Sequence, residues 1–220
     1  MATLPIVRQA VPQQSLMWDA VGVCERLASL ALLAALAPAL LPCAAMLWLL
    51  SGRSPLIAHR RVGWHGRALW MIKLRTMWDR RSGDVPEAFR WIEYIEDTVG
   101  PQHKRADDPR VTARFARFCR RHSIDELPQL WHVMQGEMSL VGPRPITQAE
   151  VERYYGADAD EVLRVKPGIA GLWQVSGRNL LTYSDRRALD LELVRRHSIR
   201  LYLEILLRAV PEVLSGANSW

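Results

Sequence analysis

The hydrophobic pattern of the chain is dominated by residues 27–52, an apolar run that contains no charged side chain. A helix needs about 20 such residues to cross the hydrocarbon core of a bilayer. Pro38 and Pro42 interrupt the run near its middle, and each removes a helical hydrogen bond. Membrane helices tolerate proline as a kink, so a spanning helix and a helix that enters and turns back both stay open. We therefore expect a membrane-embedded N-terminal region at residues 1–53, followed by one continuous core at residues 54–220.

The rest of the chain alternates between short strand-like and longer helix-like patterns. Residues 56–61 and 68–75 predict a hairpin of two strands around Gly63 and Gly66. Farther on, apolar residues recur at helical spacing. Helices are expected at residues 85–99, 111–121, 146–155, 159–165, 183–196 and 199–214, and a glycine-punctuated loop with one strand at 166–178. This pattern predicts an α-rich α+β fold.

Arginine supplies most of the positive charge, because the formal net charge is +6 and lysine occurs only at positions 73, 104 and 166. The planar guanidinium of arginine grips two phosphate oxygens at once. The same charge would also suit nucleic acid or an anionic membrane surface. Nucleic acid is the least favoured of these partners, since neither aromatic platforms nor a recognisable reading helix accompany the charge.

Two further patterns bear on the compartment. The three cysteines form no CxxC pair, and the six histidines show no HExxH spacing. These spacings favour a reducing compartment and give no sign of a zinc site. Arginines at positions 53, 60, 61 and 67 follow the apolar run, and this positive flank places the core in the cytoplasm.

Two adjacent carboxylates, Asp125 and Glu126, are the strongest chemical feature of the core. Ser123 and Glu126 have the spacing of a helix capping box, so a structural role is one interpretation. If a helix begins near Pro128 instead, both carboxylates lie at its N-terminal edge, where the helix dipole favours their ionised forms. An ionised aspartate can attack phosphorus, and its neighbour can hold Mg²⁺ together with phosphate oxygens. Adjacent residues point in different directions, which fits poorly with the facing carboxylates of a glycosidase.

Candidate phosphate-binding cations occur on both sides of this pair. Arg144 stands between two prolines, which reduces the entropy lost when it clamps a phosphate. Lys73 and Arg75 alternate along the predicted strand and so face one side of it, as a diphosphate would require. Arg120 lies near the end of the predicted basic helix, just before the carboxylates. Each of these features alone is equally typical of a turn or a solvated face. The sequence has no Walker A loop and no GxGxxG motif, so the ordinary nucleotide-phosphate loops are absent.

Taken together, these motifs resemble those of the bacterial sugar transferases, the monotopic polyprenol-phosphate phosphoglycosyl transferases. The resemblance runs from about residue 18 to the C-terminus. Besides the apolar segment with its central proline, the matching motifs are RVG (61–63), KLRTM (73–77), DPRVT (108–112), SIDELPQL (123–130), GEMSLVGPRP (136–145) and KPGIAGLWQVSGR (166–178). The resemblance implies a single catalytic domain with an N-terminal re-entrant membrane helix and amphipathic interfacial helices.

The resemblance also implies a two-step reaction. Asp125 would attack the β-phosphate of a UDP-sugar and release UMP, and undecaprenyl phosphate would then take the sugar-phosphate from the enzyme. Glu126 would hold Mg²⁺. Family positions around the diphosphate, the metal and the nucleotide correspond here to Lys73, Arg120, Arg144, Pro145, Gln174, Arg178 and Asp190. With Arg75 from the strand pattern, these form the predicted substrate-binding set.

The expected biological setting follows from the same resemblance. The motif at 172–178, with Leu189-Asp190-Leu191, is similar to members that transfer galactose-phosphate or glucose-phosphate. An N-acetylated or diacetamido donor and an inactive membrane-anchored assembly partner stay as alternatives. The family's membrane helix breaks at a Ser-Pro pair with both ends cytoplasmic, and here the pair is Ala37-Pro38. We expect the cytoplasmic face of the bacterial inner membrane, UDP-sugar, undecaprenyl phosphate and membrane lipids as partners, no nucleic acid, and exopolysaccharide, capsule or O-antigen assembly as the pathway. A homodimer stays open.

Overall fold

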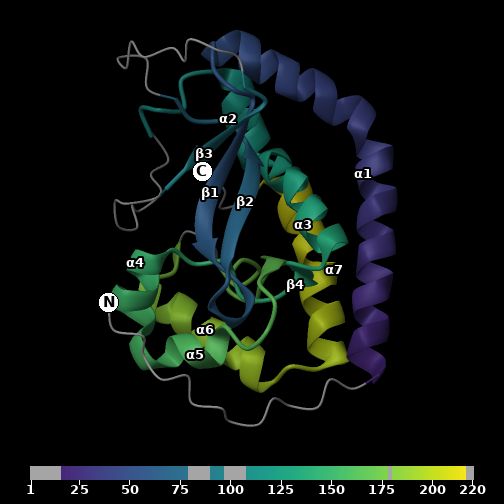
Figure 1. Cartoon of the computed structure of the whole chain (residues 1–220), viewed down its shortest axis with the longest axis vertical. Coiled ribbons are helices and arrows are strands. Elements are labelled where there is room, and N and C mark those ends of the chain that lie inside the picture. Colours follow the sequence, from purple (N-terminus) through teal and green to yellow (C-terminus); the bar gives the residue numbers. More distant parts are fainter. Residues whose placement is uncertain (1–15, 79–89, 97–107, 178–179, 217–220) are drawn as a thin grey trace.

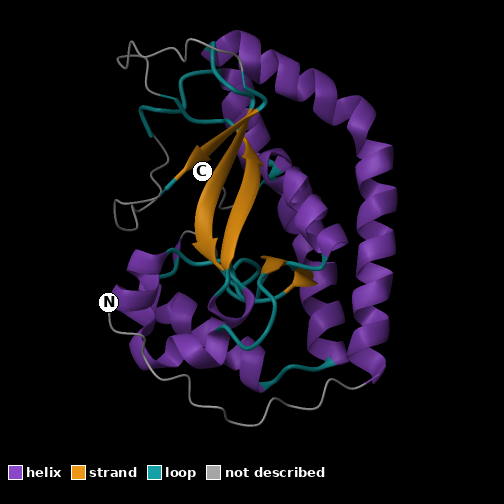
Figure 2. Ribbon diagram, viewed as in Figure 1, coloured by secondary structure: helices purple, strands orange, loops and turns teal. Residues whose placement is uncertain are grey.

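The computed structural model describes residues 16–78, 90–96, 108–177 and 180–216. Strands occupy the centre of the molecule, and helices lie along one side of them and below them (Figure 2). The helix α1 (Leu16–Ser51) runs along one side of the molecule (Figure 1). It packs against α3 (Leu130–Gln135), whereas α5 (Ala159–Val162) and α6 (Tyr183–Arg195) pack together beyond one end of the central sheet.

The fold is α-rich with a few short strands, as the sequence pattern predicts. The strands of the described residues are β1 (Leu56–Val62), β2 (Ala68–Leu74), β3 (Ile92–Ile95), β4 (Ser139–Val141) and β5 (Gly168–Ala170). The remaining helices and helical turns are η1 (Trp64–Gly66), α2 (Arg114–Arg121), η2 (Ile124–Gln129), α4 (Gln148–Glu150), η3 (Val151–Tyr155), η4 (Gly156–Asp158) and α7 (Ile199–Ser215).

The central sheet has the strand order β2–β1–β3. The predicted hairpin is confirmed, because β1 and β2 pair antiparallel from Leu56 opposite Leu74 onward. The predicted helix at residues 85–99 is wrong where the structure describes this segment. There β3 pairs in parallel with β1, and its isoleucines at 92 and 95 suit a pleated strand. Residues 85–89 and 97–99 lie outside the described chain.

The outer edge of β2 is covered by His132 of α3. The backbone N–H of Ile72 donates to Nε2 of His132 at 3.2 Å. Since Nε2 accepts this bond, Nδ1 carries the ring proton and donates to Glu137 at 2.7 Å. This buried imidazole therefore holds α3, and with it the preceding turn η2, against the sheet.

The parallel pair β4–β5 depends on two glycines that face each other. A Cβ built on Gly168 would collide with the backbone nitrogen of Gly142, and a Cβ on Gly142 with the carbonyl oxygen of Lys166. The N–H of Gly142 donates to Ala170 at 2.9 Å, and the N–H of Gly168 donates to Pro143 at 2.8 Å. The glycines thus let two backbone segments touch directly, and this contact sets the position of the loop that carries Arg144.

Helix α1 is continuous through both prolines, and its far end bends over the top of the molecule (Figure 1). Many of its apolar side chains face outward, among them Leu27, Leu41 and Leu49, which are 63%, 67% and 69% exposed. The helix is long and apolar enough to cross a membrane by length and composition. Whether it spans or re-enters stays a prediction.

One buried carboxylate attaches α1 to the part of the chain that follows it. Oε1 of Glu25 accepts hydrogen bonds from Ser139 Oγ at 2.6 Å, from the N–H of Leu140 at 2.8 Å and from Tyr202 Oη at 2.8 Å. These partners belong to β4 and α7. Glu25 is 7% exposed, so the carboxylate is removed from water and solvated by the protein instead.

Candidate active site

The carboxylate pair lies in the first turn of η2, a 3₁₀ helix between α2 and α3. Ser123 precedes it in the left-handed conformation, with φ 54°, and its side chain makes no capping hydrogen bond. The capping-box interpretation is therefore wrong, because Ser123 is left-handed rather than extended as an N-cap residue must be. The 3₁₀ turn begins at Ile124, ahead of the expected start near Pro128, and still places both carboxylates at a helix N-terminus.

Glu126 is the centre of a cluster that three distant segments build. Its Oε1 accepts a hydrogen bond from Lys73 Nζ of β2 at 2.8 Å and another from Arg144 Nη2 at 2.9 Å. The side chains of Glu126, Lys73 and Arg144 are 17%, 14% and 20% exposed, so water reaches these ion pairs only in part. We call Lys73, Glu126 and Arg144 the Glu126 cluster.

Burial and charge act together on the two cations of this cluster. Burial lowers the pKa of the Lys73 ammonium, and repulsion from Arg144 adds to this, while attraction to Glu126 opposes it. Burial, the largest single effect, lowers the pKa of Arg144, but the attraction and hydrogen bond of Glu126 together with the charges of Glu150 and Asp125 outweigh it and leave that pKa above its ordinary value. Asp125, 8% exposed, acts electrostatically on both cations. The cluster therefore gathers positive charge directly beside Asp125.

A second, fully buried carboxylate supports the backbone of Arg144. Asp190 of α6 is 0% exposed, and its Oδ2 accepts a hydrogen bond from Tyr155 Oη at 2.7 Å. Its Oδ1 has no hydrogen-bond partner among the described residues. Burial raises the pKa of Asp190 to about 7, although the Tyr155 hydrogen bond, the nearby backbone N–H of Arg144 and the charge of Arg144 lower it. A carboxylate in this position orients the Arg144 loop, in which Pro145 is also buried.

The structure does not bring Arg75 to the Glu126 cluster. β2 ends one residue earlier, and Arg75 is 4% exposed, with Nε donating to the carbonyl of Ser54 at 2.7 Å and Nη2 paired with Glu93 at 2.5 Å. The expected pairing of Lys73 and Arg75 on one diphosphate is thus not formed. Glu93, which pairs with Arg75, belongs to β3, the strand that the sequence pattern did not predict.

The other predicted residues are distributed as follows. Gln174 is 9% exposed, and its Nε2 donates to the carbonyl of Ile169 at 3.0 Å, which braces its own loop. Arg120 is partly buried at the end of α2, where its charge contributes to lowering the pKa of Asp108. Arg178 lies outside the described residues. Substrate contacts by these side chains stay predictions.

Two residues without a predicted role adjoin the Glu126 cluster. The guanidinium carbon of Arg144 lies 5.8 Å from the ring centroid of Trp173, and that of Arg186 lies 4.7 Å from the same centroid. Trp173 is 7% exposed. Arg186 precedes Asp190 by four residues in α6, so helical spacing from Asp190 could have pointed to it.

The donor set of the site fits Mg²⁺. Within residues 16–78, 90–96, 108–177 and 180–216, no group of three or more His, Cys, Asp or Glu side chains could hold a metal ion. Mg²⁺ needs no such group, because it uses one or two carboxylates and completes its shell with phosphate oxygens and water. Asp125 and Glu126 supply carboxylates of this kind beside cations that suit phosphate.

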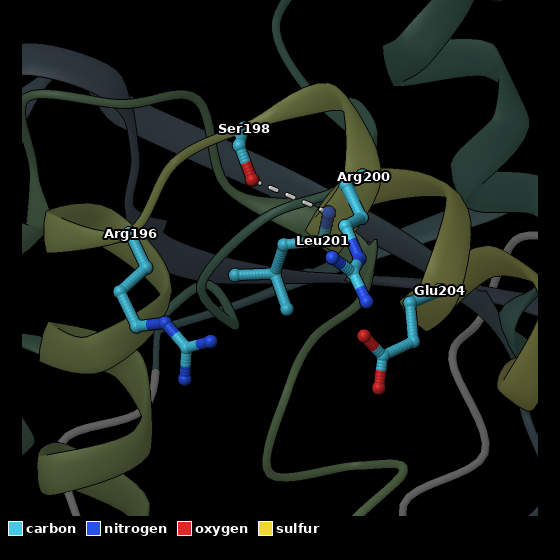
Figure 3. Close-up of a pocket in the computed structure, with 5 residues that line it drawn as sticks. All are labelled: Arg196, Ser198, Arg200, Leu201 and Glu204. Carbon is cyan, nitrogen blue, oxygen red and sulfur yellow. Dashed lines mark hydrogen bonds between the residues drawn. The ribbon is translucent and has the colours of Figure 1, made fainter.

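A separate cavity of about 220 Å³ lies at the junction of α6 and α7 (Figure 3). It is lined by Arg196, Ser198, Arg200, Leu201 and Glu204. Ser198 caps α7 there by accepting a hydrogen bond from the N–H of Leu201 at 3.3 Å. None of the predicted site residues lines this cavity, so it belongs to a different part of the surface from the Glu126 cluster.

Comparison with known proteins identifies the family to which the chain belongs. The bacterial sugar transferase family matches residues 20–216, and the chain belongs to this family of enzymes. The exopolysaccharide production protein ExoY of Sinorhizobium fredii is 37% identical over 188 residues, covering 86% of this chain and 82% of that protein.

Two further relatives carry more specific names. The UDP-glucose:undecaprenyl-phosphate glucose-1-phosphate transferase of Caulobacter vibrioides is 37% identical over 226 residues, covering 98% of this chain and 75% of that protein. The UDP-galactose-lipid carrier transferase of Erwinia amylovora is 41% identical over 169 residues, covering 77% of this chain. The chain spans 35% of the length of the Erwinia protein.

Proposed function

We propose that this enzyme transfers a sugar-1-phosphate from a UDP-sugar to undecaprenyl phosphate through a covalent intermediate on Asp125. The single observation that carries the proposal is the Glu126 cluster, which places two cations and a second carboxylate beside Asp125. Phosphoryl transfer depends on such positioning and charge stabilisation more than on complex covalent chemistry. The names of the Caulobacter and Erwinia relatives support a sugar-phosphate donor and a lipid acceptor.

The proposed chemistry has two balanced steps. A carboxylate oxygen of Asp125 forms a bond to the β-phosphorus, and the bond from that phosphorus to the bridging oxygen breaks, so UMP leaves with the electron pair. An oxygen of undecaprenyl phosphate then attacks the same phosphorus and releases the aspartate. Lys73 and Arg144 neutralise the phosphate charge in both steps. When bound at Glu126, Mg²⁺ would supply further charge neutralisation on the phosphate oxygens.

The same proposal includes the donor and the setting. We favour a hexose such as galactose or glucose, because the relatives named above act on these sugars. The name of the Sinorhizobium protein supports a role in exopolysaccharide assembly. The apolar helix α1 and the arginines after it support the cytoplasmic face of the inner membrane.

The deciding experiment measures UMP release by the purified enzyme with undecaprenyl phosphate and a panel of UDP-hexoses and N-acetylated UDP-sugars. Asp125→Asn should abolish turnover, since an amide is not a competent nucleophile here, and mass spectrometry should find a sugar-phosphate on Asp125 in the wild type. Asp160→Asn, an exposed aspartate, is the matched control. Robust turnover by Asp125→Asn would refute the covalent mechanism.

We also propose that α1 re-enters, with both ends cytoplasmic. A cysteine at position 3, in a cysteine-free background, should then resist an impermeant thiol reagent in intact cells and react after lysis. Replacing Pro38 and Pro42 with leucine should restore an unkinked helix and favour spanning. Strong labelling of the single-cysteine protein in intact cells would show that α1 crosses the bilayer.

A further inference from the structure

Arg186 occupies an unusual position on α6. Its guanidinium carbon lies 4.7 Å from the ring centroid of Trp173 and 5.1 Å from that of Tyr183. Stacking on aromatic rings holds a guanidinium in plane and leaves the N–H groups on its edge free to face a ligand. Two rings therefore orient this cation, which lowers the entropy that it would lose on binding an anion.

The described part of the chain offers Arg186 no carboxylate partner. Three other arginines of α6 and its C-cap are each paired: Arg187 with Asp158 at 3.6 Å, Arg195 with Glu161 at 2.9 Å and Arg196 with Glu192 at 2.5 Å. Nε of Arg186, like Nε of Arg187, is buried without a hydrogen-bond partner among the described residues. Arg187 has its ion pair with Asp158 as well, whereas Arg186 forms no ion pair within the described residues.

Glu150, a nearby carboxylate, is held by other residues and forms no ion pair with Arg186 within the described part of the chain. The charge of Glu150 acts on Tyr155, Tyr183 and Arg144, so it lies in the same region. However, its Oε2 accepts hydrogen bonds from the N–H of Thr147 at 2.7 Å and from Thr147 Oγ1 at 3.0 Å, which fix it in a capping box. Arg186 is thus a cation stacked on two aromatic rings, and no carboxylate among the described residues is paired with it.

Trp173 connects this cation to the Glu126 cluster. Arg144 lies 5.8 Å from the same ring centroid, and its side chain bonds Glu126 beside Asp125. A nucleoside diphosphate carries two phosphates, and only one of them is attacked. If that phosphate lies at Asp125 and Arg144, a second cation on the same aromatic platform is placed to receive the other one.

We propose that Arg186, stacked on Trp173 and Tyr183, binds the phosphate of the nucleoside monophosphate that leaves in the first step. This inference rests on the proposed function. When the bridging P–O bond breaks, the leaving phosphate gains a negative charge, and a guanidinium can meet two of its oxygens at once. Arg186 would thereby favour departure of the nucleoside monophosphate without gaining or losing a proton.

The test measures UMP and uridine binding to the full-length protein in detergent by calorimetry. Arg186→Gln should weaken UMP binding by about tenfold, as loss of one charge-assisted contact predicts, and leave uridine binding within about twofold. Arg186→Lys should fall between wild type and Arg186→Gln, because it keeps the charge but loses the planar fork. Arg195→Gln, the same charge change farther along α6, should match the wild type.

Several outcomes would overturn the inference. These are absence of UMP binding to wild type, equal UMP affinity in wild type and a folded Arg186→Gln, or equal loss of UMP and uridine binding, which would assign Arg186 to the nucleoside. Should Arg186→Gln melt early, Arg186→Lys supplies the same comparison. The UMP-release assay separates the two proposals: Arg186-dependent UMP binding without turnover on any UDP-sugar would refute the proposed function alone.

Discussion

Glu126 and Asp190 are both largely removed from water, and Arg144 contacts each of them, but their charges are balanced in different ways. Glu126 shares one oxygen between two cations and remains 17% exposed. Asp190 is fully buried, receives a hydrogen bond from the neutral Tyr155 hydroxyl, and lies near the backbone N–H of Arg144. Cations beside a carboxylate favour its ionised form, whereas burial favours the neutral acid.

This difference separates two tasks within one site. The Glu126 cluster keeps charges near the surface, where a phosphate or a divalent cation can reach them. Asp190 is fully buried on α6, beside the loop that carries Arg144, and holds the Tyr155 hydroxyl. We therefore expect substitutions in the cluster to act mainly on turnover, and substitutions around Asp190 to act mainly on stability.

The largest effect is expected for Glu126→Gln. The amide cannot balance Lys73 and Arg144 or hold Mg²⁺ equally well, so kcat/KM should fall about 100-fold or more, with residual activity that responds to added Mg²⁺ or Mn²⁺. Steady-state kinetics across a metal titration measure this. Glu96→Gln, which removes an exposed pair with Arg60, should leave turnover unchanged. Normal kinetics with a lowered melting temperature would instead assign Glu126 a purely structural role.

A smaller effect is expected from the pH dependence of stability. The pKa of Asp190 is about 7 in the folded protein, against about 3.9 in an unfolded chain. Because the folded state holds the Asp190 proton more tightly, the contribution of Asp190 to the free energy of unfolding is fully present below about pH 4. It is lost as pH rises through about 7.

Wild type should therefore lose about 3 kcal/mol of stability from this group between pH 5 and 8, while Asp190→Asn, which cannot ionise, should lack this slope. Melting curves in detergent at several pH values measure it, with Asp160→Asn as the control. If Asp190→Asn keeps the wild-type slope, Asp190 is not the titrating group.

The smallest effect is expected for Tyr155→Phe. This change removes one hydrogen bond to Asp190 and should cost about 1 kcal/mol of stability. Because that hydrogen bond lowers the pKa of Asp190, its loss should move the midpoint of the pH-dependent transition upward. Thermal melting against pH detects both changes, and an unmoved midpoint would show that Tyr155 does not act on Asp190.

Local patterns explain which elements were predictable. The β1–β2 hairpin joins neighbouring segments, and its alternation and its glycines are visible in the sequence. β3 was missed because a short strand that pairs in parallel with β1 depends on a partner distant in sequence. That error hid Glu93, so the partner of Arg75 could not be foreseen either.

The candidate site shows the same division between local motif and tertiary contact. Motifs identified Lys73, Glu126 and Arg144, which the structure brings together, and left their roles in catalysis as predictions. Trp173 and Arg186 gained no role from the sequence, because their relation arises only where the loop after β5 meets α6. Likewise, the bonds of Glu25 to β4 and α7 cannot be read from a helix that is otherwise apolar.

The Glu25 contact also sets an order of events during biosynthesis. Its hydroxyl partners, Ser139 and Tyr202, follow it by 114 and 177 residues. At about 5 to 20 residues per second, the ribosome needs roughly 9 to 35 s to reach Tyr202 after Glu25 has been made. Until Ser139 and Leu140 have been made, the Glu25 carboxylate has none of these partners, and Tyr202 completes the set only at the end of the interval. The helix is therefore made first and is secured to the catalytic region last.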